Sequence, residues 1–143
     1  MGKIKILFFC IGNSARSQMA EALLRTSAGD RFEVYSAGIE PKGINPYAKQ
    51  VLAEVGIDLS GQYSKSIHEY MGRIRFDYLI TLCGDADEKC PAAAFPVASQ
   101  RMHWPFEDPA TCQGSDEEKL VKFRQVRDQI DQTISAWLKR HYS

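Results

Sequence analysis

The sequence lacks a long hydrophobic run. Its longest apolar stretch, from Ile6 to Ile11, is far too short to cross a membrane as a helix. No small-residue cleavage site follows this stretch, as a secretory signal requires. These absences predict a cytoplasmic protein that makes no membrane contact.

The sequence also lacks net charge. Eighteen basic residues balance eighteen acidic ones, so the formal net charge is zero at pH 7. A chain without an overall field has no general attraction for nucleic acid or for an anionic membrane surface. We therefore expect no nucleic-acid partner, and any anion that the protein binds must be held by a local site.

Cysteine is sparse, with four residues in a chain of 143. In a reducing cytosol such cysteines are more often free, catalytic or metal-bound than structurally bridged, so we expect no static disulfide framework. Internal repeats, linkers and low-complexity segments are also missing. Residues 1–143 are therefore predicted to form a single domain, and we expect a monomer.

What the sequence does contain is an alternation of buried strands and helices. Apolar runs predict strands at residues 3–10, 32–36 and 76–83, with a shorter one at residues 101–104. Helical spacing of apolar residues predicts helices from near Ser17 through Arg25, over residues 46–55, and from Ser115 through Leu138. A polar stretch between the second helix and the third strand can hold one more short helix.

The ends of the helices carry recognisable signals. Asn45 is a good N-cap, Pro46 suits the first helical position and Gly56 ends the run. Ser115 and Glu118 form the capping box of the closing helix. These signals make the second and the closing helix well-defined predictions.

Strands that alternate with helices predict an α/β fold, a flavodoxin-like three-layer sandwich with a four-stranded parallel sheet and helices on both faces. In the strand order 2-1-3-4, strands one and three are neighbours, and ligands bind beyond their carboxyl ends. Cys10 ends strand one and Cys83 ends strand three, so the topology brings together two distant thiols. The loop after strand four, which carries Asp108, opens on the same edge.

The loop between the first strand and the first helix has the pattern Cys-x5-Arg-Ser, from Cys10 to Ser17. Backbone N–H groups in such a loop can surround a tetrahedral oxyanion above the positive end of a helix, and an arginine adds a fork of donors. Gly12 and Asn13 tolerate the positive φ angles that this cradle needs. The residues predicted to bind the oxyanion are Ile11, Gly12, Asn13, Ser14, Ala15 and Arg16.

Cys10 is the candidate nucleophile of this loop. The helix N-terminus, the guanidinium of Arg16 and the hydroxyl of Ser17 all favour a thiolate over a thiol. Displacement at an oxyanion also needs an acid for the departing oxygen, and Asp108 is the candidate, because Pro109 restricts it to extended conformations.

The segment from Cys10 to Ser17, together with Asp108 and Pro109, resembles the low-molecular-weight protein tyrosine phosphatase superfamily. The segment from Thr81 to Pro91 is similar to the redox segment of the thioredoxin-coupled arsenate reductases in that superfamily, as are His103-Trp104 and residues 106–110. The resemblance runs from Lys3 to about Trp137, and it implies a low-molecular-weight phosphatase-like fold with a P-loop.

The resemblance implies an enzyme of arsenic detoxification and arsenical resistance that reduces arsenate to arsenite by a three-cysteine relay. Cys10 would attack arsenate while Asp108 protonates the leaving oxygen. Cys83 would then attack Cys10 and release arsenite, and Cys90 would attack Cys83 to leave a redox-active Cys83–Cys90 disulfide. Thioredoxin would reduce that disulfide, with no bound cofactor, and phosphate or sulfate would compete with arsenate.

Two other functions stay open at this point. A phosphatase that hydrolyses aryl phosphates would use the same loop, but that branch places aromatic residues after its Asp-Pro, whereas residues 110–114 contain none. A module that binds a metal ion or arsenite could use Cys83, Cys90, His103 and Cys112, although their spacing does not match a structural zinc site. Cys112 fits no step of the relay, and glutaredoxin or a small thiol could replace thioredoxin as electron donor.

Some reductases of this branch hold a potassium ion near the anion loop. The resemblance places that site at Asn13, Glu21, Ser36 and an acid near position 65. Here position 65 is a lysine. We expect the ammonium of Lys65 to take the ion's place beside Glu21, so that no metal is bound.

Overall fold

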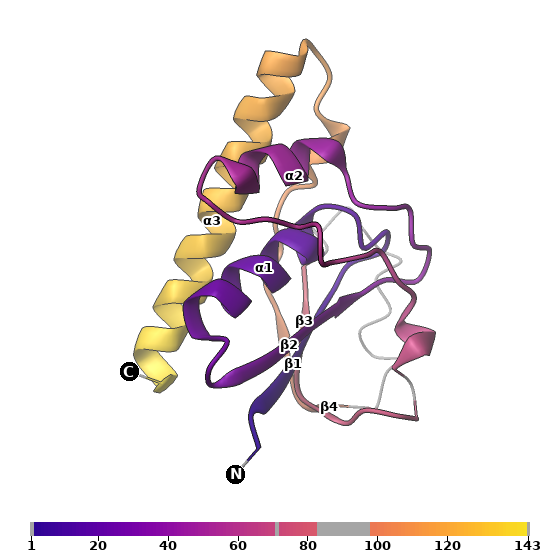
Figure 1. Ribbon diagram of the computed structural model, residues 1–143, viewed down its shortest axis with the longest axis vertical. Helices are drawn as coiled ribbons and strands as arrows, with labels where there is room; N and C mark the ends of the chain where they lie inside the picture. The colour runs from indigo at the N-terminus through magenta and orange to yellow at the C-terminus, as the bar shows by residue number, and fades with distance from the viewer. Residues whose placement is uncertain (1, 71, 83–97, 143) are drawn as a thin grey trace.

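The computed structural model describes residues 2–70, 72–82 and 98–142. Its sheet consists of four parallel strands in the order β2-β1-β3-β4, which confirms the predicted order (Figure 1). The strands are β1 (Ile4–Phe9), β2 (Phe32–Ala37), β3 (Phe76–Thr81) and β4 (Ala98–His103). The fourth strand begins before its predicted start and ends at His103.

In the part of the chain that the structure describes, three α-helices connect and close the sheet: α1 (Arg16–Ala28), α2 (Pro46–Ala53) and α3 (Asp116–Tyr142). Among the described residues, two short 3-10 helices, η1 (Ile67–Glu69) and η3 (Pro109–Thr111), lie in the connecting segments. The predicted caps are present, since Asn45 accepts a bond from the N–H of Tyr47 at 2.8 Å. Ser115 and Glu118 exchange their two capping bonds at 3.2 Å each.

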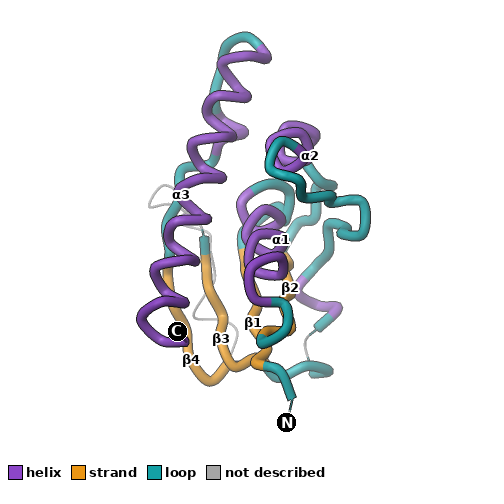
Figure 2. Tube along the Cα trace, turned by 60° about the vertical axis from the view of Figure 1, so that its left-hand side comes forward, coloured by secondary structure: helices purple, strands orange, loops and turns teal. Residues whose placement is uncertain are grey.

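The α-helices pack together on one face of the sheet (Figure 2). Alternation along β1 divides its side chains, so that Ile6 and Phe8 join the helix-facing core while Leu7 and Phe9 face the other side. On that other side they pack with Ile67 of η1. In the described part of the chain the second face is therefore covered by η1 and its flanking loops.

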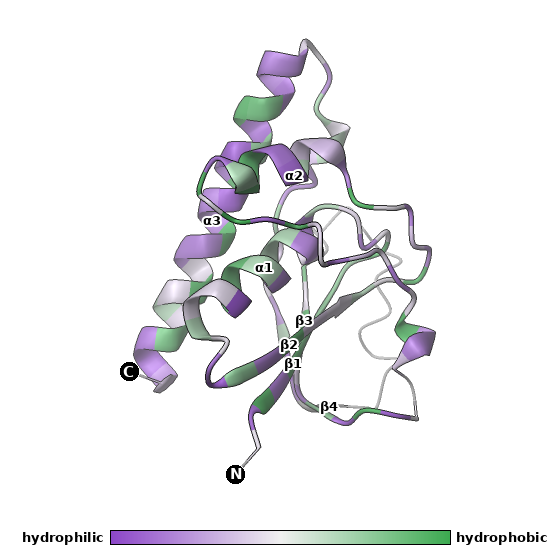
Figure 3. Cartoon of the chain, in the orientation of Figure 1, coloured by the Kyte–Doolittle hydropathy of each residue, from purple (hydrophilic) through white to green (hydrophobic). Residues whose placement is uncertain are grey.

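Helix α3 runs along much of the longest axis of the molecule and is amphipathic (Figure 1). Hydrophobic and hydrophilic residues alternate along it in Figure 3, and its buried stripe includes Phe123, Ile130 and Trp137. Within the described ranges, no helix is long and apolar enough to cross a membrane.

The topology sets the place of the site. Cys10 follows β1 directly, and its N–H bonds to the carbonyl of Ala37 at the end of β2 at 3.3 Å. Leu82 follows β3, and its N–H bonds to the carbonyl of Phe9 at 2.9 Å. The carboxyl ends of the three strands thus meet where Cys10 leaves the sheet.

Candidate active site

The loop of residues 11–15 turns its carbonyl groups outward. Each accepts a hydrogen bond from a residue outside the loop or from the first turns of α1. The donors are the N–H groups of Ile39, Glu40, Lys42, Asn45 and Met19 and the side-chain amide of Gln18. The five backbone N–H groups of the loop, in contrast, donate to no acceptor within the described ranges. The loop is therefore an array of available donors, as an oxyanion site requires.

Asn13 fixes the shape of this loop. It is fully buried and is the non-glycine residue with positive φ, at 45°, in the described chain. Its Oδ1 must face the backbone N–H of Lys65, 2.9 Å away, because that group can only donate. The Nδ2 group therefore points toward Ser17 and Ser36, at 2.8 and 3.0 Å. Of the two residues expected to tolerate positive φ, Asn13 adopts it and Gly12 does not.

Cys10 lies at the floor of the loop and is only 3% exposed. Its Sγ is 3.0 Å from the hydroxyl of Ser17, the second residue of α1. Because Asn13 already donates to this hydroxyl oxygen, the Ser17 proton is free to point at the sulfur. A hydrogen bond in that direction stabilises the thiolate form of Cys10, which is the form that attacks.

Arg16 joins the loop to the segment after β4. Its Nη1 donates to the carbonyls of Phe106 and Leu82, at 3.1 and 3.4 Å. Its Nη2 lies 3.6 Å from Oδ2 of Asp108. Asp108 in turn accepts a bond from the N–H of Ala110 at 3.0 Å, which caps η3. The candidate acid is thereby held at the edge of the loop.

These groups surround a cavity of about 230 Å³, large enough for a tetrahedral oxyanion. The lining residues are Cys10, Ile11, Gly12, Ser14, Ala15, Arg16, Lys42, Asp108 and Ala110. Asn13 is absent from the lining because its side chain turns inward. The cavity therefore joins the predicted nucleophile, the predicted arginine and the predicted acid.

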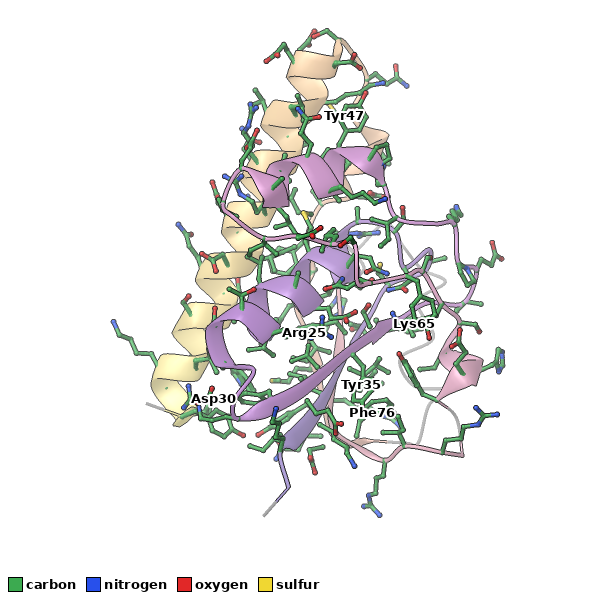
Figure 4. The ribbon with its side chains drawn as sticks, in the orientation of Figure 1. Arg25, Asp30, Tyr35, Tyr47, Lys65 and Phe76 are labelled. Atoms are coloured by element: carbon green, nitrogen blue, oxygen red, sulfur yellow. The ribbon has the colours of Figure 1, made fainter. Side chains whose placement is uncertain are left out.

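A buried charged cluster lies behind the loop. Glu21 of α1 is faced by Arg25 on one side and by Lys65 on the other, and both labelled cations can be followed in Figure 4. The Lys65 ammonium is 3.7 Å from Oε1 of Glu21, and both side chains are nearly completely buried. Ser36 donates a short hydrogen bond to the same carboxylate oxygen. The residues expected at a cation site are thus linked by hydrogen bonds from Asn13 to Ser36 and from Ser36 to Glu21, and the Lys65 ammonium lies beside Glu21.

Lys65 is held by more than its charge partner. Its ammonium donates to the carbonyl of Tyr63 at 2.8 Å and lies 4.7 Å from the centre of the Tyr63 ring. Burial lowers the pKa of Lys65, and the carboxylate of Glu21 opposes that shift. Its carboxylate, carbonyl and ring contacts therefore hold the Lys65 ammonium beside Glu21.

Four further candidates from the sequence are Cys83, Cys90, His103 and Cys112. Cys83 and Cys90 lie outside the described residues. His103 bonds through Nδ1 to the hydroxyl of Thr81 at 2.7 Å. Cys112 follows η3 and is partly buried, with the carbonyl of Gln113 as a weak acceptor at 3.6 Å. No group of three or more histidine, cysteine or acidic residues in the described ranges could hold a metal ion.

Three residues of the site were not predicted from the sequence. Gln18 donates to both oxygens of Asn13 and to the carbonyl of Tyr63, at 2.9 to 3.1 Å. Gly38 packs directly against the anion loop, and Lys42 lines its cavity. Of these three residues only Gly38 has a local sequence signal, since it is a glycine directly after the second strand. Gln18 and Lys42 contact segments that are distant in sequence, and no local pattern marks them.

Comparisons with known proteins show the family of the chain. Residues 5–141 match the family of low molecular weight phosphotyrosine protein phosphatases. An arsenate reductase of Bacillus subtilis is 50% identical over 132 residues, which cover 92% of this chain and 93% of that protein.

Solved structures of arsenate reductases also superpose on this chain. An arsenate reductase in the phosphate binding state superposes with a TM-score of 0.78 at 33% identity, covering 96% of this chain and 98% of the other. A thioredoxin-dependent arsenate reductase of Corynebacterium glutamicum superposes with a TM-score of 0.68 at 31% identity. That match covers 96% of this chain and 61% of the other.

Proposed function

The chain belongs to the low molecular weight phosphotyrosine protein phosphatase family, and from that premise we propose that it is an arsenate reductase of the cytoplasm. Similarity to arsenate reductases at up to 50% identity over nearly the full length supports this choice within the family. The proposed reaction uses three thiols in sequence, those of Cys10, Cys83 and Cys90, and thioredoxin as the reductant.

In the first step the Cys10 thiolate attacks the arsenic atom of bound arsenate. A sulfur–arsenic bond forms, one arsenic–oxygen bond breaks, and Asp108 supplies the proton with which the oxygen leaves as water. The N–H groups of the loop and Arg16 hold the other oxygens. Ser17 stabilises the thiolate before the attack, and its position 3.0 Å from Sγ supports that role.

In the second step Cys83 attacks the sulfur of Cys10. A disulfide forms, the sulfur–arsenic bond breaks, and its electron pair stays on arsenic, which leaves as arsenite. The two thiols are oxidised by two electrons, and arsenic(V) is reduced to arsenic(III). Cys90 then attacks Cys83, so that Cys10 departs as a thiolate and thioredoxin reduces the remaining disulfide.

The observation that carries the reductive step is the position of Leu82. Its N–H bonds to the carbonyl of Phe9, the residue before Cys10, and its carbonyl accepts from Arg16. Leu82 is joined to Cys83 by one peptide bond. The strand that leads into Cys83 therefore ends beside the nucleophile, and this arrangement supports a transfer of the oxidation from Cys10 to Cys83.

The lining of the cavity argues against an aryl phosphatase. Ala110 lines the cavity after Asp108, and η3 presents no aromatic side chain there to hold a phosphotyrosine ring. Slow cleavage of aryl phosphates is still expected, because phosphate and arsenate share shape and charge and the first chemical step is the same.

We also propose that Lys65 makes a bound potassium ion unnecessary. Its ammonium lies 3.7 Å from Glu21, and its backbone N–H holds Asn13 at 2.9 Å. The cluster can thus keep Asn13, and through it the anion loop, in shape without a cation. Turnover is expected to be independent of potassium.

Turnover of arsenate with thioredoxin, thioredoxin reductase and NADPH tests the proposal. The wild type should give multiple turnovers, whereas Cys83→Ser and Cys90→Ser should lose them and keep their cleavage of aryl phosphate. Cys112→Ser is the matched control and should behave as the wild type. Full turnover in Cys83→Ser would overturn the three-thiol sequence, and replacement of thioredoxin by glutaredoxin tests the choice of electron donor.

A further inference from the structure

One cation of the cavity has no part in the steps above. Lys42 lies in the loop between β2 and α2, and its side chain lines the cavity together with Cys10, Arg16 and Asp108. Lys42 is exposed to solvent and is not part of the core.

The backbone of Lys42 is tied to the anion loop. Its N–H donates to the carbonyl of Gly12 at 3.0 Å, and the N–H groups of Ile39 and Glu40 both donate to the carbonyl of Ile11, at 2.9 and 3.0 Å. These three hydrogen bonds therefore hold the segment of residues 39–42 against the loop. Lys42 has a fixed starting point from which its side chain extends.

The side chain of Lys42 crosses the loop at Gly12. A Cβ atom at position 12 would lie 3.3 Å from Cδ and 3.6 Å from Cγ of Lys42. Gly12 has no positive φ, so its lack of a side chain serves space rather than backbone conformation. The absence of a Cβ atom leaves room for the aliphatic part of Lys42 to reach the cavity.

The charges in the cavity leave a bound oxyanion without a full set of positive partners, and the Lys42 ammonium can supply one. The positive charge of Arg16 is shared with Asp108, which lies 3.6 Å away. An arsenate or phosphate ion carries more than one negative charge at neutral pH. Lys42 forms no ion pair with any residue in the described ranges, so its charge is available to a ligand.

We propose that Lys42 is a binding residue for the oxyanion, an ammonium at the rim of the anion loop that contacts an outer oxygen of arsenate or phosphate. This inference rests on the proposed function for arsenate, but it applies to phosphate without it. Arg16 and the loop N–H groups hold the ion from below, and Lys42 closes the open side. The contact strengthens binding of the ion more than it speeds the chemical step.

Binding of inorganic phosphate, measured by titration calorimetry on the full-length reduced protein, tests this proposal separately from turnover. Lys42→Gln should raise the Kd for phosphate about fivefold to tenfold, as expected for one ammonium at contact distance in a wet site. Lys42→Glu should raise it further, and Lys42→Arg should restore it. The backbone bond to Gly12 survives in every variant.

The matched control is Lys49→Gln, which removes the same charge from an exposed lysine of α2 that lines a different groove. It should leave the Kd unchanged. The effect of Lys42→Gln should also shrink at high salt, whereas a merely structural effect would not. For arsenate turnover, KM should rise more than kcat falls.

The outcomes separate the two proposals. A protein that fails to reduce arsenate but shows the Lys42 effect on phosphate contradicts the proposed function and keeps the role of Lys42. An active arsenate reductase in which Lys42→Gln binds phosphate as tightly as the wild type overturns the role of Lys42. An equal effect of Lys49→Gln overturns it too, because the cause would then be net charge.

Discussion

Gly38 packs closely against the anion loop, so its replacement by alanine tests the structure of the site. It follows β2, where its N–H donates to the carbonyl of Lys65 at 2.9 Å and its own carbonyl accepts from Ile67 at 2.8 Å. These bonds fix Gly38 from the side opposite the loop. A side chain added here has no direction in which the backbone can easily retreat.

The distances set the size of the effect. A Cβ atom at position 38 would lie 2.5 Å from the carbonyl oxygens of both Cys10 and Ile11, and 2.9 Å from the nitrogen of Asn13. Real Cβ atoms essentially never come within 3.0 Å of such atoms. All three contacts are backbone, so the loop itself must move by more than half an ångström. Such overpacking costs about 1–3 kcal/mol of stability.

The loss of activity should exceed what the loss of stability suggests. A displacement of about 1 Å in a site that depends on aligned donors lowers the rate about a hundredfold. We therefore expect Gly38→Ala to remain folded at low temperature, with a lowered midpoint in urea titrations. Its arsenate turnover should fall about a hundredfold, and the rate at which iodoacetamide alkylates Cys10 should differ clearly from that of the wild type.

Gly61→Ala is the matched control. It makes the same substitution at a glycine that has no positive φ and nothing within 4 Å of the added Cβ atom. Its stability should stay within about 0.5 kcal/mol of the wild type. If Gly38→Ala keeps wild-type stability and wild-type alkylation of Cys10, then the anion loop is not held by contact with β2, and this reasoning is wrong.

Three further changes test other parts of the site and fold. Ser17→Ala removes the proton donor to the nucleophile and should slow alkylation of its thiol by iodoacetamide about tenfold; an unchanged rate would contradict the hydrogen-bond direction. Lys65→Asp places a second carboxylate beside Glu21, so turnover of this variant should become dependent on potassium at constant ionic strength. A clear potassium dependence of the wild type would count against the proposed role of the Lys65 ammonium. Hydrogen bonds from Arg124 lower the pKa of Glu54, so this carboxylate stabilises the fold above its unfolded pKa and loses that contribution on acidification. Glu54→Gln should therefore lower the urea midpoint at pH 7, with a difference from the wild type that disappears in acid.

Much of the fold follows from local sequence signals. The capping residues Asn45, Ser115 and Glu118 mark helix starts because their side chains satisfy backbone groups only a few residues away. The apolar runs of β1 and β3 indicate strands buried on both faces, and this burial places them in the centre of a parallel sheet. The strand order 2-1-3-4 needs, in addition, the assignment of the chain to the flavodoxin-like class.

The anion loop was predictable for the same reason. Cys10, Arg16 and Ser17 lie within one strand-loop-helix unit, so their proximity is set by neighbours in sequence. Asp108 was predictable only through the topology, which brings the loop after β4 to the same edge of the sheet. The structure places its carboxylate 3.6 Å from Arg16.

The residues that escaped prediction act between distant segments. Gly38 is needed because two backbones approach closely, and a lone glycine after a strand carries no information about what it touches. Lys42 lies in an irregular loop whose path is set by hydrogen bonds to residues 11 and 12. The polar bonds of Gln18 to Asn13 and Tyr63 depend on a segment with little regular structure.

The central claim is that the oxidation of Cys10 passes to Cys83, and the most direct measurement is the disulfide formed after a single addition of arsenate. Reduced protein is treated with arsenate in the absence of thioredoxin, quenched by alkylation and analysed by peptide mass spectrometry. The wild type should release one arsenite per molecule and carry a Cys83–Cys90 disulfide, and Cys90→Ser should carry a Cys10–Cys83 disulfide. Arsenite release from Cys90→Ser with both Cys10 and Cys83 alkylated as free thiols would contradict the account.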